Sequence, residues 1–525
     1  MSLYLRLIFF SLIFLVGYLR WSYHLILTLP LKTSTINLDM SIILDKISLI
    51  GVTLVLLISG CVFLFSYKYM REDHNEARFA LILGGFVASI LLLLLGNSIT
   101  FILIGWDGLG ITSFLLIIYY DRKTNNRSGL ITFIVNRFGD AMLIGNAVYF
   151  ISYGHVDLGI YLGLFITVIY IVVAITKRAQ YPFSIWLPLA IDAPTPVSAL
   201  VHRRTLVTAG LFFLARIIPE NLNLYLRFIG GITLCVGGIC AIFSSDLKKL
   251  IANSTLSNLG LIIIILSIRN KDLIIFHLFT HALFKAGLFI LAGRILMQCF
   301  GAQDGRVVFS SLRNSPLLSS FIRAFFLSSR GIFFIRTFYS KHHIVIISQA
   351  DGNNLIRFLL IFLGVILSTL YRLRFAFMIV RNFKGSRAIS RSVPTEVKFS
   401  IIILGACSIV FGNRYNIRIL YSIFSYEVPL LVIILLRLVI FLNLINKINR
   451  VLYSSILFID SLIDVINFKN SSILAKVYSL DYGFGRLETR NYVNIIKINL
   501  AGLTRISRVN TSLVLIFITT LLLFI

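Results

Sequence analysis

The stretch that decides the fold runs from Ile171 to Ala215 and reads IVVAITKRAQYPFSIWLPLAIDAPTPVSALVHRRTLVTAGLFFLA. Lys177, Asp192 and His202 stand in it among apolar runs typical of membrane helices. Four of the nine prolines of the chain fall between residues 182 and 196, beside these ionisable side chains. Freed carbonyl groups at membrane depth are tolerated only inside protein or next to water, so the pattern predicts a broken helix with a function.

The composition around this stretch is that of a polytopic membrane protein. Of the 525 residues, 58% are hydrophobic and 13% are charged, and the mean hydropathy is +0.93. Apolar segments of about 20 residues recur, giving about 14 to 16 candidate spans. We therefore predict an all-α polytopic membrane protein. Its first span is residues 3–17, because no A-x-A-like cleavage site follows to make that segment a signal peptide.

The charge balance and the cysteines exclude several classes of function. The net charge of +28 is spread over the ends of spans, as in YKYMRED and RNFKGSRAISR, which favours contact with phospholipid headgroups and not with nucleic acid. The five cysteines show neither C-x-x-C nor Cys/His spacing, so no metal site or iron–sulfur cluster is expected in this chain. High hydrophobicity without an Arg-rich, Ser-rich transit peptide fits a protein made inside an organelle.

Further ionisable residues stand inside the predicted spans. Asp107 lies in the middle of the span 99–120, where an acid is by default functional, although it can also cap or pack locally. Arg137 and Asp140 are three residues apart on one helix and share a face, so they form either a structural ion pair or part of a transfer path. Lys248 belongs to DLKK, a predicted loop and helix start whose lysines are shared between ion pairing and proton transfer.

A second polar row is formed by His277, His281 and Lys285, which are four residues apart and share one helix face. Histidines at this spacing can also bind zinc, but HLFTH lacks the glutamate of H-E-x-x-H and has no third ligand nearby. A polar row in an apolar helix instead suits proton transfer through water and neutral imidazole. We expect these side chains to line a hydrated interior path.

Several of these blocks together resemble a known family. They are TK-x-AQ-x-PF-x-x-WLP, APTPVSALVH and TLVTAG in the opening stretch, and GWDGLG (105–110), NRFGD (136–140), DLKKLIANSTLSNLG (246–260), HLFTHALFKA (277–286) and FYSK (338–341) outside it. The chain is similar to the antiporter-like chain 5 of NADH:ubiquinone oxidoreductase, respiratory complex I. The resemblance covers about residues 40–345 well and the last third mainly by hydropathy.

The resemblance implies an architecture of two inverted five-helix repeats, each with a broken helix, followed by a lateral amphipathic helix. The corresponding segments are N-terminal transmembrane helices (1–97), the antiporter-like core (98–345), C-terminal transmembrane helices (346–445), the lateral helix (446–510) and a terminal membrane anchor (511–525). We expect a multi-pass protein of the mitochondrial inner membrane.

The resemblance also implies which residues translocate protons. Lys177 matches the central lysine of the first half-channel, although a lysine at a span end can instead reach the interface. Asp107 is expected to pair with it, directly or through one water. The whole predicted path is Asp107, Lys177, His202, His277, His281, Lys285 and Lys341, with Arg137, Asp140 and Lys248 in support.

Four positions depart from the family pattern. Arg178, Arg203 and Arg204 stand where relatives carry serine, and His342 stands where many carry aspartate. The arginines are either genuine or a mistranslation of AGA and AGG codons that the organism reads as serine. The chain has only 6 Met against abundant Ile, which indicates that AUA codons were translated as isoleucine and leaves the same kind of error open for arginine. If genuine, at least one of them should contact Asp140 or Asp192, or reach the membrane surface.

The predicted function is proton translocation within NADH:ubiquinone oxidoreductase, coupled to quinone reduction elsewhere in the complex. No cofactor is expected in this chain, while NADH, FMN, iron–sulfur clusters and ubiquinone bind partner subunits. The expected partners are other membrane-arm subunits, above all the neighbouring antiporter-like chain, with accessory subunits and phospholipids. Two alternatives stay open, a subunit of a multisubunit monovalent cation/proton antiporter and a membrane scaffold with an inactive channel.

Overall fold

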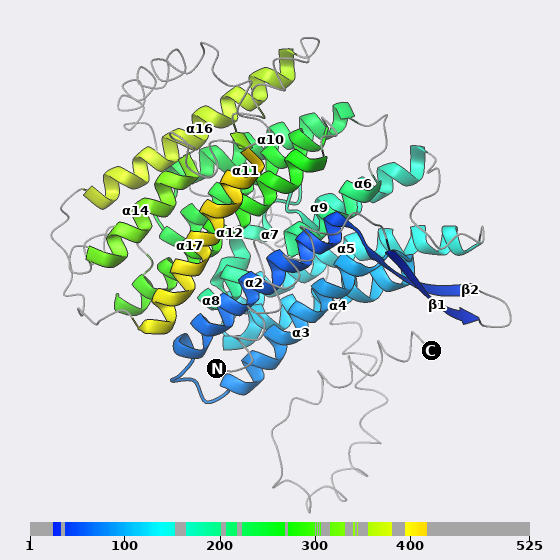
Figure 1. Ribbon diagram of the computed structural model, residues 1–525, viewed down its shortest axis with the longest axis horizontal. Coiled ribbons are helices and arrows are strands. Elements are labelled where there is room, and N and C mark those ends of the chain that lie inside the picture. The colour runs from blue at the N-terminus through cyan, green and yellow to red at the C-terminus, as the bar shows by residue number, and fades with distance from the viewer. Residues whose placement is uncertain are drawn as a thin grey trace, which may run out of the picture. The chain divides into compact units, whose positions relative to one another are not determined.

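The computed structural model describes residues 25–32, 37–152, 164–200, 206–217, 223–267, 271–299, 301, 303, 305, 316–330, 340–341, 344, 355–380 and 394–416. Helices dominate this part of the chain (Figure 1). The expected first span, residues 417–445 of the predicted C-terminal transmembrane segment, the lateral helix and the terminal anchor lie outside it. His202, Arg203, Arg204 and His342 lie outside it as well.

The described chain opens with a β-hairpin that the sequence analysis did not anticipate within residues 1–97. Strand β1 (Leu25–Lys32) pairs antiparallel with β2 (Asn37–Leu44), and Leu25 lies opposite Leu44. Ile42 forms a bridge to Gly96, which joins the hairpin to the end of a helix. Alternating apolar side chains in LILTLPLK suit the two-residue period of a strand, a pattern too short for a membrane helix.

The first bundle of helices contains the expected span 99–120. Before it, α2 (Lys46–Tyr69) and α3 (Glu76–Leu95) form a helical hairpin within the predicted transmembrane segment 1–97. After it come α4 (Ile99–Ile117), the short 3-10 helix η1 (Ile118–Tyr120), α5 (Lys123–Ser152) and α6 (Leu164–Lys177). Gly105 lets α4 approach α3 closely, since an added Cβ there would lie 2.8 Å from the Leu93 nitrogen.

The predicted broken helix is confirmed where α6 ends at Lys177. Short pieces follow: α7 (Trp186–Leu189), the 3-10 helix η2 (Ala190–Asp192), α8 (Thr195–Leu200) and α9 (Leu206–Ile217). Ala179 has a φ of 53°, which a continuing right-handed helix cannot accommodate. The freed Thr176 carbonyl accepts a hydrogen bond from the Trp186 indole at 2.9 Å, as membrane depth requires.

The remaining described helices follow the break, and the longest of them packs against several others. They are α10 (Asn223–Phe243), α11 (Leu247–Leu266), α12 (Lys271–Gln298), α14 (Pro316–Arg330), α16 (Leu355–Val380) and α17 (Thr395–Asn416). The apolar window of α12 is buried throughout, while that of α3 is buried over less than half of its length. α12 packs against α2, α8, α11, α14 and α17, and so links the segments on either side of the break.

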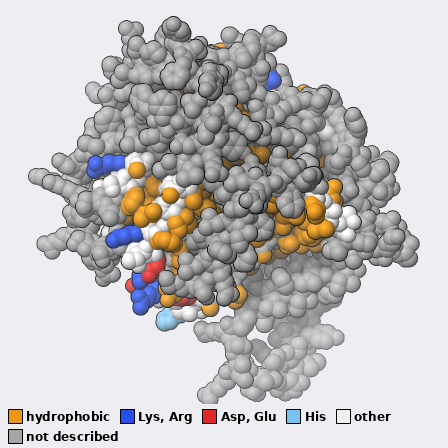
Figure 2. All heavy atoms as spheres, in the orientation of Figure 1, with side chains coloured by type: hydrophobic (Ala, Val, Ile, Leu, Met, Phe, Trp, Pro, Cys, Tyr) orange, Lys and Arg blue, Asp and Glu red, His pale blue; other side chains and the backbone are white. Residues whose placement is uncertain are grey.

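Six helices of the described chain are long and apolar enough to cross a membrane, namely α2, α3, α4 with η1, α10, α11 and α12. The face of the molecule seen in Figure 2 is mainly hydrophobic where it is described, with charged side chains gathered at its margin. Apolar side chains at the surface suit contact with lipid or with other membrane subunits. The polytopic membrane class is therefore confirmed, while the inverted relation of two repeats stays a prediction.

Candidate proton-translocation site

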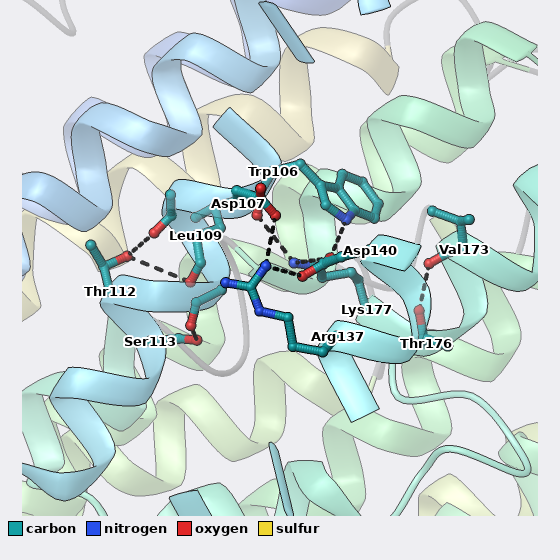
Figure 3. Close-up of polar contacts among 12 residues, drawn as sticks. Trp106, Asp107, Leu109, Thr112, Ser113, Arg137, Asp140, Val173, Thr176 and Lys177 are labelled. Atoms are coloured by element: carbon teal, nitrogen blue, oxygen red, sulfur yellow. Dashed lines mark hydrogen bonds and ion pairs between the residues drawn. The ribbon is translucent and has the colours of Figure 1, made fainter. Parts of the chain in front are cut away.

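Five side chains from three helices form the first cluster: Trp106 and Asp107 on α4, Arg137 and Asp140 on α5, and Lys177 at the end of α6. Figure 3 shows their polar groups converging between these helices. Trp106, Asp140 and Lys177 are buried, at 0%, 2% and 1% exposed. Two cations and two carboxylates therefore meet between these three helices.

Lys177 is paired with Asp140. Its Nζ lies 3.2 Å from Asp140 Oδ1 and donates a hydrogen bond to the Trp106 carbonyl at 3.1 Å. The end of α6 thus turns the lysine into the protein, so the alternative in which it reaches the membrane interface is wrong. A buried charge is stabilised only when it is paired and hydrogen-bonded, and Lys177 meets both conditions.

Asp107 is placed differently from the expected direct pair with Lys177. Arg137 Nη1 donates to Asp107 Oδ1 at 3.3 Å and lies 3.6 Å from Asp140 Oδ2. The expected ion pair of Arg137 with Asp140 is confirmed, and the same guanidinium joins the two carboxylates. The expected direct pair of Asp107 with Lys177 is wrong, because ion pairs link Asp107 to Arg137, Arg137 to Asp140 and Asp140 to Lys177 instead (Figure 3). A contact through one water stays a prediction.

The GWDGLG segment explains this placement. Trp106 and Asp107 are neighbours on α4, so their side chains point about 100° apart on a helix of 3.6 residues per turn. Trp106 faces Lys177 in the interior, whereas the Asp107 side chain is 23% exposed. At Gly110 an added Cβ would lie 3.6 Å from Lys177 Nζ and 3.7 Å from Asp140 Oδ2, so this glycine adjoins the ion pair.

Arg178, next to Lys177, is 0% exposed. Its guanidinium does not reach the surface and does not pair with Asp140, and among the described residues none of its three side-chain nitrogens has a hydrogen-bond partner. Part of the side chain packs at Gly210 of α9, where an added Cβ would lie 2.9 Å from Arg178 Cγ. Arg178 thus neither contacts Asp140 nor reaches the surface, while the Asp192 side chain and residues 203 and 204 lie outside the described part of the chain.

The second cluster lies along α12 and beside it: His277, His281, Lys285, Ser340 and Lys341. The two histidine rings stack with centroids 6.3 Å apart, and His277 Nδ1 lies 2.9 Å from Ser340 Oγ. Lys285 Nζ bonds to Ser254 Oγ of α11. All three α12 side chains are buried, at 1%, 5% and 3% exposed, and hydroxyl groups contact two of them, which agrees with the expected interior polar row.

Ser340 connects this row to the last expected residue of the path. It precedes Lys341, whose Nζ donates to Ser368 Oγ of α16 at 3.3 Å. Lys248 is buried near the start of α11, which begins directly after Asp246 as the DLKK pattern predicts. Within the described residues no group of three His, Cys, Asp or Glu side chains could hold a metal ion.

Sequence reasoning missed the side chains that hold these groups. Trp106 and the serines 254, 340 and 368 carry no charge, so a search for ionisable residues in spans passes over them. Trp106 could have been noticed because a buried indole N–H needs an acceptor. Ser254 and Ser368 also bond to backbone carbonyls of their own helices, as serines in helices commonly do. Their presence in the sequence therefore does not indicate a contact with a buried lysine.

The comparisons with known proteins agree with this geometry. Residues 96–370 match the family model described as NADH:quinone oxidoreductase/Mrp antiporter, transmembrane, and residues 31–80 match that of the complex I chain 5 N-terminus. A solved structure of an Mrp complex from Dietzia sp. DQ12-45-1b superposes with a TM-score of 0.62 at 20% identity, covering 89% of this chain and 59% of that one. The fold is that of an antiporter-like membrane domain.

The chain is also similar in sequence to proteins named NADH-ubiquinone oxidoreductase chain 5. The one from Anopheles gambiae is 36% identical over 430 residues, 79% of this chain and 73% of its own length. That from Mytilus edulis is 33% identical over 486 residues, 86% and 85% of the two chains, and that from Locusta migratoria is 40% identical over 348 residues, 64% and 61%. The chain belongs to the NADH-ubiquinone oxidoreductase chain 5 family.

Proposed function

We propose that this chain is a membrane-arm subunit of respiratory NADH-ubiquinone oxidoreductase, and that it translocates protons across the mitochondrial inner membrane. The observation that carries the proposal is the first cluster, a chain of alternating charges from Asp107 through Arg137 and Asp140 to Lys177. Asp140 and Lys177 are buried, which is costly, and ionisable residues kept inside membrane helices mark proton or ion paths. The family membership supports the same function.

Arg137 gives the first cluster two states. It touches both carboxylates, so loss of negative charge at Asp107 would let it move fully onto Asp140. There it would compete with Lys177 for the same carboxylate, and the protonated lysine would be less well stabilised. A charge change at Asp107, on the more exposed side of the cluster, would thus drive release of a proton from Lys177.

The second cluster offers the onward route. His281 and His277 lie between Lys285 and Ser340, and Ser340 adjoins Lys341. Neutral imidazole can accept a proton on one nitrogen and pass one from the other. Lys341, with Ser368, would govern release. His202 stays a proposed member of this path.

The partners and cofactors follow from the proposed complex. NADH, FMN, iron–sulfur clusters and ubiquinone would bind other subunits, and the neighbouring antiporter-like chain would supply the charge change at Asp107. The alternative, a stand-alone monovalent cation/proton antiporter, draws on the fold shared with the Mrp complex. Co-purification with flavin and iron–sulfur proteins supports the first function, and purification without them supports the second.

Lys177→Met tests the function directly, because methionine keeps much of the side-chain volume and removes the charge. In the purified complex in proteoliposomes, we expect the number of protons pumped per NADH to fall more than the amount of assembled complex does. Lys249→Met is the matched control, since Lys249 is a half-exposed surface lysine paired with Asp246 at 3.4 Å. Equal losses of pumping and assembly in Lys177→Met would instead assign Lys177 a structural role.

A further inference from the structure

Trp106 contacts both members of the Lys177–Asp140 pair through three different groups. Its indole Nε1 donates to Asp140 Oδ1 at 2.8 Å, its carbonyl accepts from Lys177 Nζ at 3.1 Å, and its ring lies 5.0 Å from that Nζ. The indole N–H and the lysine therefore share one carboxylate oxygen. A hydrogen bond from a buried donor to a carboxylate is stronger than one between neutral groups, and an aromatic face attracts a cation at this distance.

The indole is itself held in place. Trp106 is 0% exposed, and its ring lies 5.4 Å from that of Phe213, which in turn lies 5.3 Å from Tyr170. Phe213 belongs to α9, the helix after the break, and Tyr170 to α6, the helix before it. The aromatic contacts thus connect Trp106 to both sides of the broken helix.

We propose that Trp106 is a positioning residue for proton translocation, which fixes Asp140 with its N–H and Lys177 with its ring and carbonyl so that the lysine exchanges its proton within one defined pair. The inference rests on the proposed function of Lys177. Without the indole N–H, Asp140 Oδ1 keeps Lys177 as its only described donor, and the carboxylate can turn toward Arg137, which lies 3.6 Å from its other oxygen. Trp106 thereby favours the ion pair of Asp140 with Lys177 over the one with Arg137.

The test compares Trp106→Phe with Trp186→Phe in the assembled complex. Both remove one indole N–H from a fully buried ring, but the Trp186 N–H bonds to the Thr176 carbonyl and not to an ionisable group. Phenylalanine keeps an aromatic face for Lys177 but loses ring volume as well as the N–H, and Trp186→Phe controls for that loss of volume. Protons pumped per NADH, the rate of NADH oxidation and the amount of assembled complex are measured for each variant.

We expect Trp106→Phe to lower the protons pumped per NADH by about tenfold, the effect on an equilibrium of one charge-assisted hydrogen bond, and to lower assembly by much less. Trp186→Phe, which changes a buried ring in the same way, should lower assembly by a similarly small amount and keep the ratio. A normal ratio in Trp106→Phe, an equal fall of ratio and assembly, or equal ratios in the two variants would each overturn the assignment. Lys177→Met is measured beside them: if it pumps normally, the proposed function fails, whereas if only Trp106→Phe pumps normally, the role of Trp106 alone fails.

Discussion

The two clusters stabilise their cations in different ways. In the first, Lys177 and Arg137 face two carboxylates on neighbouring helices. In the second, Lys285 and Lys341 each bond to a serine hydroxyl, and Lys285 Nζ also lies 5.9 Å from the centre of the Phe284 ring. The sequences of α10, α11, α14 and α16 contain no Asp or Glu, and α12 has only Asp272, its second residue.

This difference separates two tasks. A cluster of opposite charges responds strongly to a nearby change of charge, because Coulomb interactions are large where water is excluded. The described helices around the second cluster supply no carboxylate except Asp272, so a row of imidazole, hydroxyl and amine groups there should hold a cation less strongly and let protons pass along it. We infer that the first cluster senses the charge change and the second conducts the proton.

Asp140→Asn should break the first cluster with the largest effect. Asparagine keeps an oxygen for the Trp106 N–H but removes the charge opposite Lys177, and breaking a buried ion pair costs about 3 to 5 kcal/mol. Pumping should fall by roughly a hundredfold, and assembly should also suffer. In the double variant Asp140→Asn/Lys177→Met, assembly should recover, because no unpaired lysine charge remains. Normal pumping in Asp140→Asn would show that the cluster does not sense charge.

Among the described residues, Arg178 has none of the pairing that the first cluster provides. A buried guanidinium left unpaired costs about 3 kcal/mol, and a serine at 178 would remove that cost. We therefore expect peptides of the natural chain to have the mass of serine at this position. If the mass is that of arginine, Arg178→Ser should raise the thermal stability of the assembled complex. Unchanged stability would mean that the guanidinium finds a partner in another subunit or outside the described residues.

Ser340→Ala should weaken the second cluster by less. It removes the hydroxyl that contacts His277 Nδ1, and a neutral hydrogen bond contributes about 1 kcal/mol. Pumping should fall about fivefold with assembly unchanged. Ser244→Ala is the control, since that hydroxyl bonds only to the Ala241 carbonyl of its own helix among the described contacts. A loss as large as that of Asp140→Asn would place the charge-sensing step in the second cluster.

Gly110→Ala is expected to have the smallest effect. The added methyl group would lie 3.6 Å from Lys177 Nζ, an ordinary contact, so stability should change by less than about 0.5 kcal/mol. Gly105→Ala, one turn earlier, would press against the α3 backbone and should lower assembly visibly. If Gly110→Ala instead stops pumping with assembly unchanged, the space beside the ion pair holds water that the transfer needs.

The sequence by itself determined the class of fold, the broken helix and the family. Hydropathy over about 20 residues reports burial in lipid directly, and the prolines at 182–196 interrupt any regular helix. Spacing along one helix was enough for the Arg137–Asp140 pair and for the row His277, His281 and Lys285, because neighbours on a helix face are fixed by its 3.6-residue period. The β-hairpin was not predicted, because its strands are short and apolar and lie in a region that reads as membrane helix.

Only the tertiary structure decided which groups pair between helices. Asp107 and Asp140 lie on different helices, and no sequence pattern says which of them reaches the end of α6. That choice depends on the rotation of α4 about its axis, which the close approach of Gly105 to α3 helps to fix. The same rotation turns Trp106 inward and Asp107 toward Arg137, because adjacent residues on a helix face different directions. Contacts between helices are decided by packing, and therefore by the whole fold.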